Sequence, residues 1–210
     1  LDYMTELVKH LQIKSKEKFT VLFAPSWGAA SLLTRFSDAI LEKLSMKKDW
    51  NIIFRPHPQS YIFEKNTLNK LFEKYKNEKN IIMDKSADVV STMAKADVLI
   101  SDFSSIVYEF AFLFNKPIVY SFQNMNYEIY DVSTLDKLTW KYDAIKKLGT
   151  EINLENIDNL TDIIENASKH ANIEYVKEIA WQKRGQAAKN VVDFLVSKQT
   201  ELSKADGNSL

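Results

Sequence analysis

The sequence is short of several features, and each shortage narrows its chemistry. Its 210 residues include no cysteine, four glycines and four prolines, and its 28 lysines and arginines equal its 28 aspartates and glutamates. The absence of cysteine excludes disulfides, thiolate metal sites and thiol catalysis, and it is compatible with a reducing compartment. The balanced charge argues against a broad nucleic-acid surface, although a local basic patch is compatible with it, and we expect no nucleic-acid partner.

Long apolar runs and the common ligand signatures are also missing. No run approaches the roughly 20 apolar residues that cross a bilayer, so we expect neither a transmembrane segment nor a signal peptide. The stretch "APSWG" at residues 24–28 contains no Gly-x-Gly-x-x-Gly pattern and no Walker lysine, which excludes the ordinary dinucleotide and P-loop signatures. Histidines and carboxylates do not share metal-ligand spacing, so no metal site is expected.

A regular alternation of short apolar runs and amphipathic stretches is present. Helical patterns occupy residues 1–13, 31–44, 61–75, 88–96 and 103–115. The apolar runs typical of buried parallel strands lie at 19–24, 50–54, 80–83, 97–101 and 116–121. This rhythm predicts an α/β fold, a Rossmann-like parallel sheet with helices on both faces.

The chain is expected to form one domain over residues 1–198, with its core at 19–121. A helical part at 143–198 follows, and Gly185 predicts a kink or boundary inside its last helix. Residues 199–210 are polar, and we expect a flexible tail. Because the sequence begins at Leu1 without a methionine, we interpret it as a piece of a longer protein.

The stretch "DFSSIVYEF" at residues 102–110 follows a predicted strand and opens an apolar helix. Ligands of open α/β sheets bind beyond the carboxyl ends of the strands. Asp102 is able to cap this helix by accepting from the amide of Ser104 or Ser105. Alternatively, the helix N-terminus and the two serine hydroxyls form a site for a phosphate, because free N–H groups and a partial positive charge attract anions.

Two further loops follow predicted strands. In "RPHP", two prolines hold His57 stiffly and Arg55 adds a permanent charge. The loop is therefore either a rigid surface turn or a preorganised phosphate contact, in which His57 also protonates a leaving phosphate. In "APSWG", Ser26 and Trp27 could face the cleft and Gly28 permits close approach of the backbone, but a plain turn fits equally well.

Three segments together resemble the successive motifs of the CDP-glycerol glycerophosphotransferase family, the teichoic-acid polymerase type. They read "VLFAPSWG", "NIIFRPHPQS" and "MAKADVLISDFSSIVYEFAFLFNKPIVY". Members show an Ala-Pro-Thr type turn, a His-Pro loop and an Asp-Tyr-Ser-Ser segment before a Lys/Arg-Pro-Ile strand. Order and spacing match over residues 19–121, with a weaker echo at 184–195. Gly28 stands where many relatives have arginine, and Arg184 where they often have aspartate.

The resemblance implies the C-terminal, donor-binding half of a GT-B architecture, with the N-terminal acceptor half and its catalytic histidine absent from this chain. It implies transfer of glycerol phosphate from CDP-glycerol to a polymer hydroxyl with release of CMP, and no cofactor besides the substrate nucleotide. His57 would be the catalytic contact to the donor diphosphate, and Ser104 and Ser105 would hold phosphate. Asp102 would orient the helix start or touch the donor, and Glu109 matches a position that is often acidic.

The implied partners are a nucleotide-activated donor and a polymeric or lipid-linked acceptor, which is reached through the absent half. The resemblance also implies a cytoplasmic parent protein, peripheral on the inner face of the membrane, and a fragment that is inactive alone. Three alternatives stay open. They are a GT-B nucleotide-sugar glycosyltransferase, a nucleotide-sugar epimerase, and a non-catalytic module that binds a nucleotide or glycan.

Overall fold

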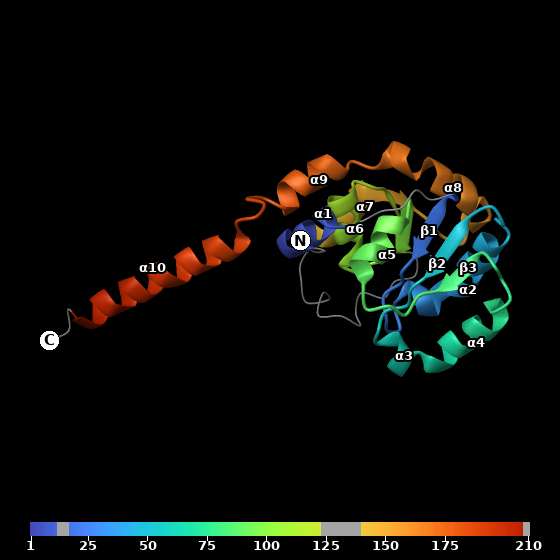
Figure 1. Cartoon of the computed structure of the whole chain (residues 1–210), viewed down its shortest axis with the longest axis horizontal. Helices are drawn as coiled ribbons and strands as arrows, with labels where there is room; N and C mark the ends of the chain where they lie inside the picture. Colours follow the sequence, from blue (N-terminus) through green and yellow to red (C-terminus); the bar gives the residue numbers. More distant parts are fainter. Residues whose placement is uncertain (12–16, 123–139, 208–210) are drawn as a thin grey trace.

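The computed structural model describes residues 1–11, 17–122 and 140–207. Its centre is a six-stranded parallel sheet in the order β3-β2-β1-β4-β5-β6 (Figure 1). The strands are β1 Thr20–Phe23, β2 Asn51–Phe54, β3 Ile81–Met83, β4 Val98–Ser101, β5 Ile118–Tyr120 and β6 Gly149–Glu151. This is the strand order of a Rossmann fold, so the α/β prediction is confirmed.

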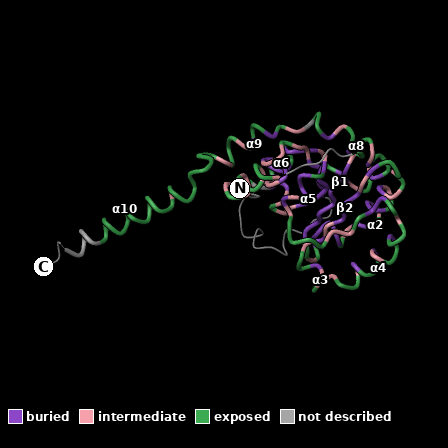
Figure 2. The backbone as a smooth tube through the Cα atoms, in the orientation of Figure 1, coloured by how far each residue is buried: buried purple, intermediate pink, exposed green. Residues whose placement is uncertain are grey.

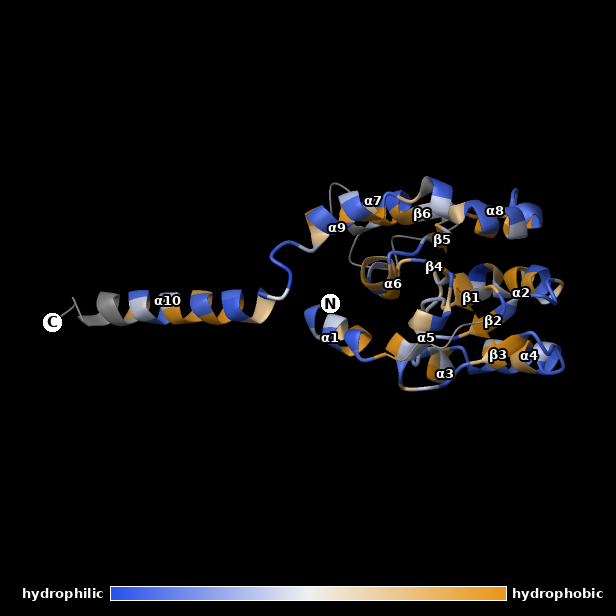
Figure 3. Cartoon of the chain, turned by 45° about the horizontal axis from the view of Figure 1, so that its top comes forward, coloured by the Kyte–Doolittle hydropathy of each residue, from blue (hydrophilic) through white to orange (hydrophobic). Residues whose placement is uncertain are grey.

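Helices cover both faces of the sheet (Figure 3). Side chains alternate along β1, so that Val21 and Phe23 enter one apolar cluster and Leu22 enters the other. The first cluster contains α2 (Leu32–Ser45), α4 (Lys65–Tyr75) and α8 (Leu160–Asn166). The second contains α1 (Asp2–Lys9), α5 (Val89–Lys95), α6 (Ile106–Phe114), α7 (Trp140–Leu148) and α9 (Ile173–Ala180).

Several boundaries differ from the sequence prediction. The helix expected at 61–75 breaks at Glu64 into α3 (Ser60–Phe63) and α4, and α6 begins at Ile106 rather than at 103. The part expected to be helical over 143–198 also contains the strand β6, in addition to the 3₁₀ turns Ile157–Asn159 and Ala167–His170. Most of the aperiodic stretch 123–147 lies outside the described residues.

The predicted boundary at Gly185 is confirmed. Its φ of +76° is a left-handed conformation, and it separates α9 from α10 (Ala187–Gly207). The helix α10 leaves the body of the molecule and continues past residue 198, into the segment expected to be a flexible tail (Figures 1 and 2). Its apolar side chains are exposed, among them Val191, Phe194 and Leu195. No helix in the described part of the chain is long and apolar enough to span a membrane.

Gly149 opens β6 at a point where two backbones nearly touch. A Cβ at this position would lie 1.8 Å from the carbonyl oxygen of Ile118, its partner in the β5–β6 register. The lack of a side chain is therefore what allows β6 to pair at the edge of the sheet.

We expect Gly149→Ala to lower the free energy of unfolding by about 2–3 kcal/mol, because the backbones must separate. Urea unfolding followed by tryptophan fluorescence measures this change. The control is Gly185→Ala, where an added Cβ meets no atom within 4 Å and only the left-handed backbone costs about 1 kcal/mol. An equal or smaller loss for Gly149→Ala would show that β6 does not depend on this contact.

Candidate functional site

The candidate ligand cavity lies where the strand order reverses. The chain runs outward from β1 to β2 and β3, and then returns to place β4 on the other side of β1. A crevice forms at the carboxyl edge of such a sheet, between the loops that follow the two central strands. The loops after β1, β2, β3 and β4 line a cavity of about 270 Å³ there.

Five of the predicted site residues meet in this cavity. Arg55 and His57 come from the loop after β2, and Ser104, Ser105 and Glu109 come from the start of α6. They are joined by Ala24, Pro25, Pro56, Pro58, Ala87, Val89 and Ile106. The expectation that these loops converge at one edge of the fold is confirmed. The remaining predicted residues, Ser26, Trp27, Gly28 and Asp102, lie beside the cavity.

Asp102 has a different role from the two that the sequence suggested. Its side chain is fully buried, and Oδ1 accepts hydrogen bonds from the amide of Ser26 (3.0 Å) and from the Ser26 hydroxyl. Oδ2 accepts from the amide of Leu32 at 2.6 Å. Asp102 therefore caps α2 rather than its own helix, and a buried carboxylate with these partners is not exposed to a donor. The reason is topological, because β4 lies directly beside β1.

This arrangement decides which helix is open to an anion. The start of α2 is the position that binds pyrophosphate in dinucleotide-binding Rossmann folds, but here the carboxylate of Asp102 occupies it. Burial raises the pKa of Asp102, and the hydrogen bonds from Ser26 and Leu32 act against that rise. The hydroxyl of Ser26 is buried and donates to Asp102, so it is not available to a ligand in the cavity.

The start of α6 faces the cavity instead. Ser105 is its N-cap residue, and the side chain of Ser105 makes no capping hydrogen bond. The Ser104 hydroxyl lies 3.5 Å from the amide of Ile106, at the outer limit of a hydrogen bond. The amides of Val107 and Tyr108 already pair with the carbonyls of Ser104 and Ser105. The two serine hydroxyls and the partial positive charge of the helix start are what suit a phosphate here. The phosphate interpretation of "DFSS" is thus favoured over a capping role for its aspartate.

His57 is held in one orientation and one tautomer. The amide of Gln59 donates to its Nδ1 at 3.2 Å, so in the neutral ring the proton lies on Nε2. Burial lowers the pKa of His57, while the negative charges of Glu64 and Asp102 raise it. The indole of Trp27 stacks on the imidazole with ring centroids 6.1 Å apart. The Nε2–H group is therefore the donor that His57 offers to a ligand.

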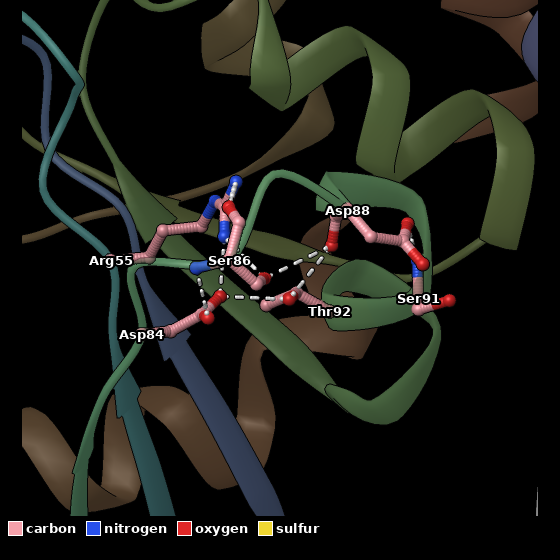
Figure 4. Close-up of polar contacts among 6 residues, drawn as sticks. All are labelled: Arg55, Asp84, Ser86, Asp88, Ser91 and Thr92. Carbon is pink, nitrogen blue, oxygen red and sulfur yellow. Dashed lines mark hydrogen bonds and ion pairs between the residues drawn. The ribbon is translucent and has the colours of Figure 1, made fainter.

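Arg55 is not the isolated charge that the sequence suggested (Figure 4). Its Nη1 lies 2.5 Å from Oδ2 of Asp84, and its Nη2 donates to the carbonyl of Ser86 at 2.8 Å. The side chains of Arg55 and Asp84 are each only 14% exposed. Asp84 also accepts from the Thr92 hydroxyl at 2.8 Å and from the amide of Ser86 at 3.0 Å. Arg55 thus lines the cavity as one half of an ion pair.

Sequence reasoning missed Asp84 and Thr92. A usable signal existed for Asp84, which directly follows the run 80–83 and so lies at the carboxyl end of the strand beside β2. Glu109 was among the predicted site residues, and its carboxyl lines the cavity. Burial raises the pKa of its carboxyl, and the Ser105 hydroxyl lies 3.5 Å from Oε1. Within the described ranges, no group of three or more histidines or carboxylates could hold a metal ion.

The two departures from the expected motifs have separate explanations. Gly28 has φ of +91°, a conformation that arginine would adopt only with strain. Arg184 lies between α9 and α10 with its guanidinium 5.3 Å from the Trp181 ring, and it lines a different cavity. Neither departure alters the residues that line the carboxyl-edge cavity.

A family model described as CDP-Glycerol:Poly(glycerophosphate) glycerophosphotransferase matches residues 2–197. The chain belongs to this family. A comparison with curated protein sequences finds no match. The resemblance noted from the three motifs is therefore confirmed, and it extends over almost the whole chain.

Solved structures of the wall teichoic acid polymerase TagF are similar to the chain. A variant soaked with CDPG has a TM-score of 0.51 and 19% identity over 96% of this chain and 47% of that chain. A second variant has a TM-score of 0.50 and 18% identity over 96% and 48%. The chain thus spans about half the length of these proteins. The expected fold class, a Rossmann-like half of a GT-B architecture, is confirmed.

We expect Asp84→Asn to lower stability by about 1–2 kcal/mol at pH 7. Burial opposes ionisation of Asp84, but the hydrogen bonds from Ser86, Thr92 and Arg55 outweigh it and lower the pKa to about 2. The ionised carboxylate therefore stabilises the fold above about pH 4, and this contribution is lost as the pH falls toward 2. Urea unfolding of both proteins at pH 7 and near pH 2.5 measures the difference.

The matched control for that experiment is Asp158→Asn. Its side chain is 81% exposed and pairs with Lys43, so we expect a change within about 0.5 kcal/mol at both pH values. A gap between wild type and Asp84→Asn that stays constant across this pH range would show that the ion pair with Arg55 is not what Asp84 contributes.

Substitution by alanine should destabilise the fold strongly at Asp102 and only slightly at Ser104. Asp102→Ala leaves buried donors of Ser26 and Leu32 without a partner, and we expect a loss of about 3 kcal/mol in unfolding free energy. Ser104→Ala should change stability by less than about 0.5 kcal/mol. Chemical denaturation compares them directly, and comparable stability losses would refute the separate structural and ligand roles.

Proposed function

We propose that this chain is the donor-nucleotide-binding half of a transferase that moves glycerol phosphate from CDP-glycerol to a cell-surface polymer. The observation that carries the proposal is the convergence of Arg55, His57 and the α6 start on one cavity at the strand-order reversal, in a chain of this family. Each group favours a phosphorylated ligand for an independent reason. Arg55 contributes a guanidinium, His57 an imidazole N–H donor, and α6 its N-terminus.

In the proposed mechanism the diphosphate of the donor lies against the start of α6. The hydroxyls of Ser104 and Ser105 and the adjacent amides hold one phosphate, and Nε2–H of His57 donates to an oxygen of the other. An acceptor hydroxyl attacks the phosphorus of the glycerol phosphate. The bond to the bridging oxygen then breaks, and CMP leaves with that oxygen. His57 and the helix start stabilise the negative charge that collects on the departing CMP.

Glu109 is assigned to donor hydroxyl groups rather than to phosphate. A carboxylate next to a diphosphate is repelled, whereas a carboxylate that accepts hydrogen bonds from ribose hydroxyls is a recurrent feature of nucleotide sites. Burial raises the pKa of Glu109, which is the direction expected of a carboxyl enclosed by the cavity wall. Arg55, held by its ion pair with Asp84, is a fixed part of the cavity wall.

The cavity is small for a complete site. Its volume of about 270 Å³ lies below the roughly 300–1,000 Å³ of typical ligand pockets. We therefore propose that a second half supplies the remaining donor contacts, the polymeric or lipid-linked acceptor and the base that takes the hydroxyl proton. The length of the TagF chains, about twice the matched region, supports this. Such a parent would act at the inner face of the membrane, where a lipid-linked acceptor is reached.

Calorimetry on the isolated chain tests the proposal. We expect CDP-glycerol and CMP to bind, and we expect His57→Ala and Ser104→Ala each to weaken CDP-glycerol binding by roughly tenfold or more. A lost hydrogen bond to a charged group is worth about 1.5–3 kcal/mol. Transfer to an acceptor should not occur without the second half.

The matched control is Ser45→Ala, at the end of α2 on the opposite edge of the sheet, which should bind like wild type. Nucleotide sugars such as UDP-GlcNAc form the comparison set. Binding of a nucleotide sugar in preference to CDP-glycerol would favour a glycosyltransferase or epimerase. No binding of any nucleotide, or full binding by both cavity variants, would refute the proposed donor site.

A further inference from the structure

The indole of Trp27 is exposed yet ordered against two other rings. It follows β1 in the loop before α2 and is 42% exposed. Its ring stacks on His57, and it also stacks on Phe63 with centroids 5.3 Å apart and an interplanar angle of 23°. Aromatic stacking of this kind is worth about 0.5–1.5 kcal/mol. The loop is fixed on one side of Trp27 by the hydrogen bonds of Ser26 to Asp102, and a second contact fixes it on the other side.

Glu64 supplies that restraint through the neighbouring residue. The amide of Gly28 donates to Oε1 of Glu64 at 3.0 Å, and Gly28 has a left-handed φ of +91°. Glu64 is the junction of α3 and α4, so its backbone is fixed by two helices. A single hydrogen bond thereby attaches the Trp27 loop to the element that follows the His57 loop.

The second carboxylate oxygen of Glu64, Oε2, lowers the stability of the fold. Oε2 of Glu64 is buried, and it has no hydrogen-bond partner within the described structure. A buried polar atom without a partner costs about 1–3 kcal/mol, and more when the group is charged. A glutamate that is only half satisfied is a poor stabiliser of the fold. Its position beside the imidazole of His57 offers a different reason for its presence.

We propose that Glu64 is a positioning residue for His57, which holds Trp27 over the imidazole through the Gly28 amide and places a negative charge beside the ring. This role rests on the proposed function for its catalytic meaning. With Nδ1 tied to the Gln59 amide and one face stacked on Trp27, the imidazole keeps a single orientation, and Nε2 is presented to the donor. Sequence analysis placed Glu64 inside a continuous helix and gave it no role.

The charges around His57 fix the sign of the expected titration change. Glu64 and Asp102 both favour the protonated imidazole, and burial opposes it. Arg55 and Glu109 line the same cavity. Because Asp102 is itself bound to three donors of Ser26 and Leu32, changing Glu64 leaves its surroundings in place. Removal of the Glu64 charge should therefore lower the pKa of His57.

NMR of the 210-residue chain tests the positioning role with two variants. The His57 ring signals are assigned by their loss in His57→Gln. Glu64→Ala should abolish the ring-current shift that Trp27 imposes on His57 and lower the His57 pKa. Glu64→Gln keeps an oxygen for the Gly28 amide, so it should keep the ring-current shift while the His57 pKa still falls. The control, Glu73→Gln, changes an exposed carboxylate on α4 that pairs with Lys76, and it should alter neither quantity.

Two results would overturn the inference. One is a ring-current shift that survives in Glu64→Ala, because Trp27 would then be held without Glu64. The other is an unchanged His57 pKa in Glu64→Gln. If Glu64→Ala fails to fold, the titration of Glu64→Gln decides the question.

Donor binding separates this inference from the proposed function. In calorimetry, Glu64→Ala and Trp27→Ala should each weaken CDP-glycerol binding by about tenfold, and Glu64→Gln by less. Misplacement of one group by about 1 Å is sufficient for effects of this size. If wild type binds no nucleotide, the proposed function fails, while the NMR measurements still decide whether Glu64 positions His57.

Discussion

The site depends on one buried carboxylate. Asp102 joins the loop after β4 to the loop after β1, and its three hydrogen bonds fix both at the point where the strand order reverses. The carboxylate of Asp102 fills the start of α2. The start of α6, which follows the other central strand and lines the cavity, is therefore the place we propose for a ligand anion. The location of the proposed phosphate site thus follows from the contacts of Asp102 with Ser26 and Leu32.

The carboxylates near the cavity are arranged so that an anion is tolerated. Asp84 is neutralised by Arg55, Asp102 is bound to backbone amides and a hydroxyl, and Glu64 is bound to the Gly28 amide. Burial raises the pKa of Glu109, and the Ser105 hydroxyl lies 3.5 Å from its Oε1. A count of acidic side chains would suggest a repulsive pocket, whereas their partners leave the helix start and His57 as its main polar donors.

The sequence was sufficient for five of the six strands and for the residues gathered at the carboxyl edge of the sheet. Alternating apolar runs locate strand ends, and strand ends in a parallel sheet share one edge, so Arg55, His57 and Ser104 could be grouped in advance. Contacts that depend on which strands are neighbours could not be predicted from the sequence. The pairs Asp102–Leu32 and Gly28–Glu64 link distant segments, and β6 is a three-residue edge strand without an apolar run.

The helix α10 has a consequence for how the molecule melts. Its side chains at 187–202 are almost all exposed, so it shares little of the burial that makes the body cooperative. A helix in this situation loosens before the sheet does, and circular dichroism then mixes two events. All four tryptophans, at 27, 50, 140 and 181, lie outside it. Tryptophan fluorescence consequently reports on unfolding of the globular part alone and not on unfolding of α10.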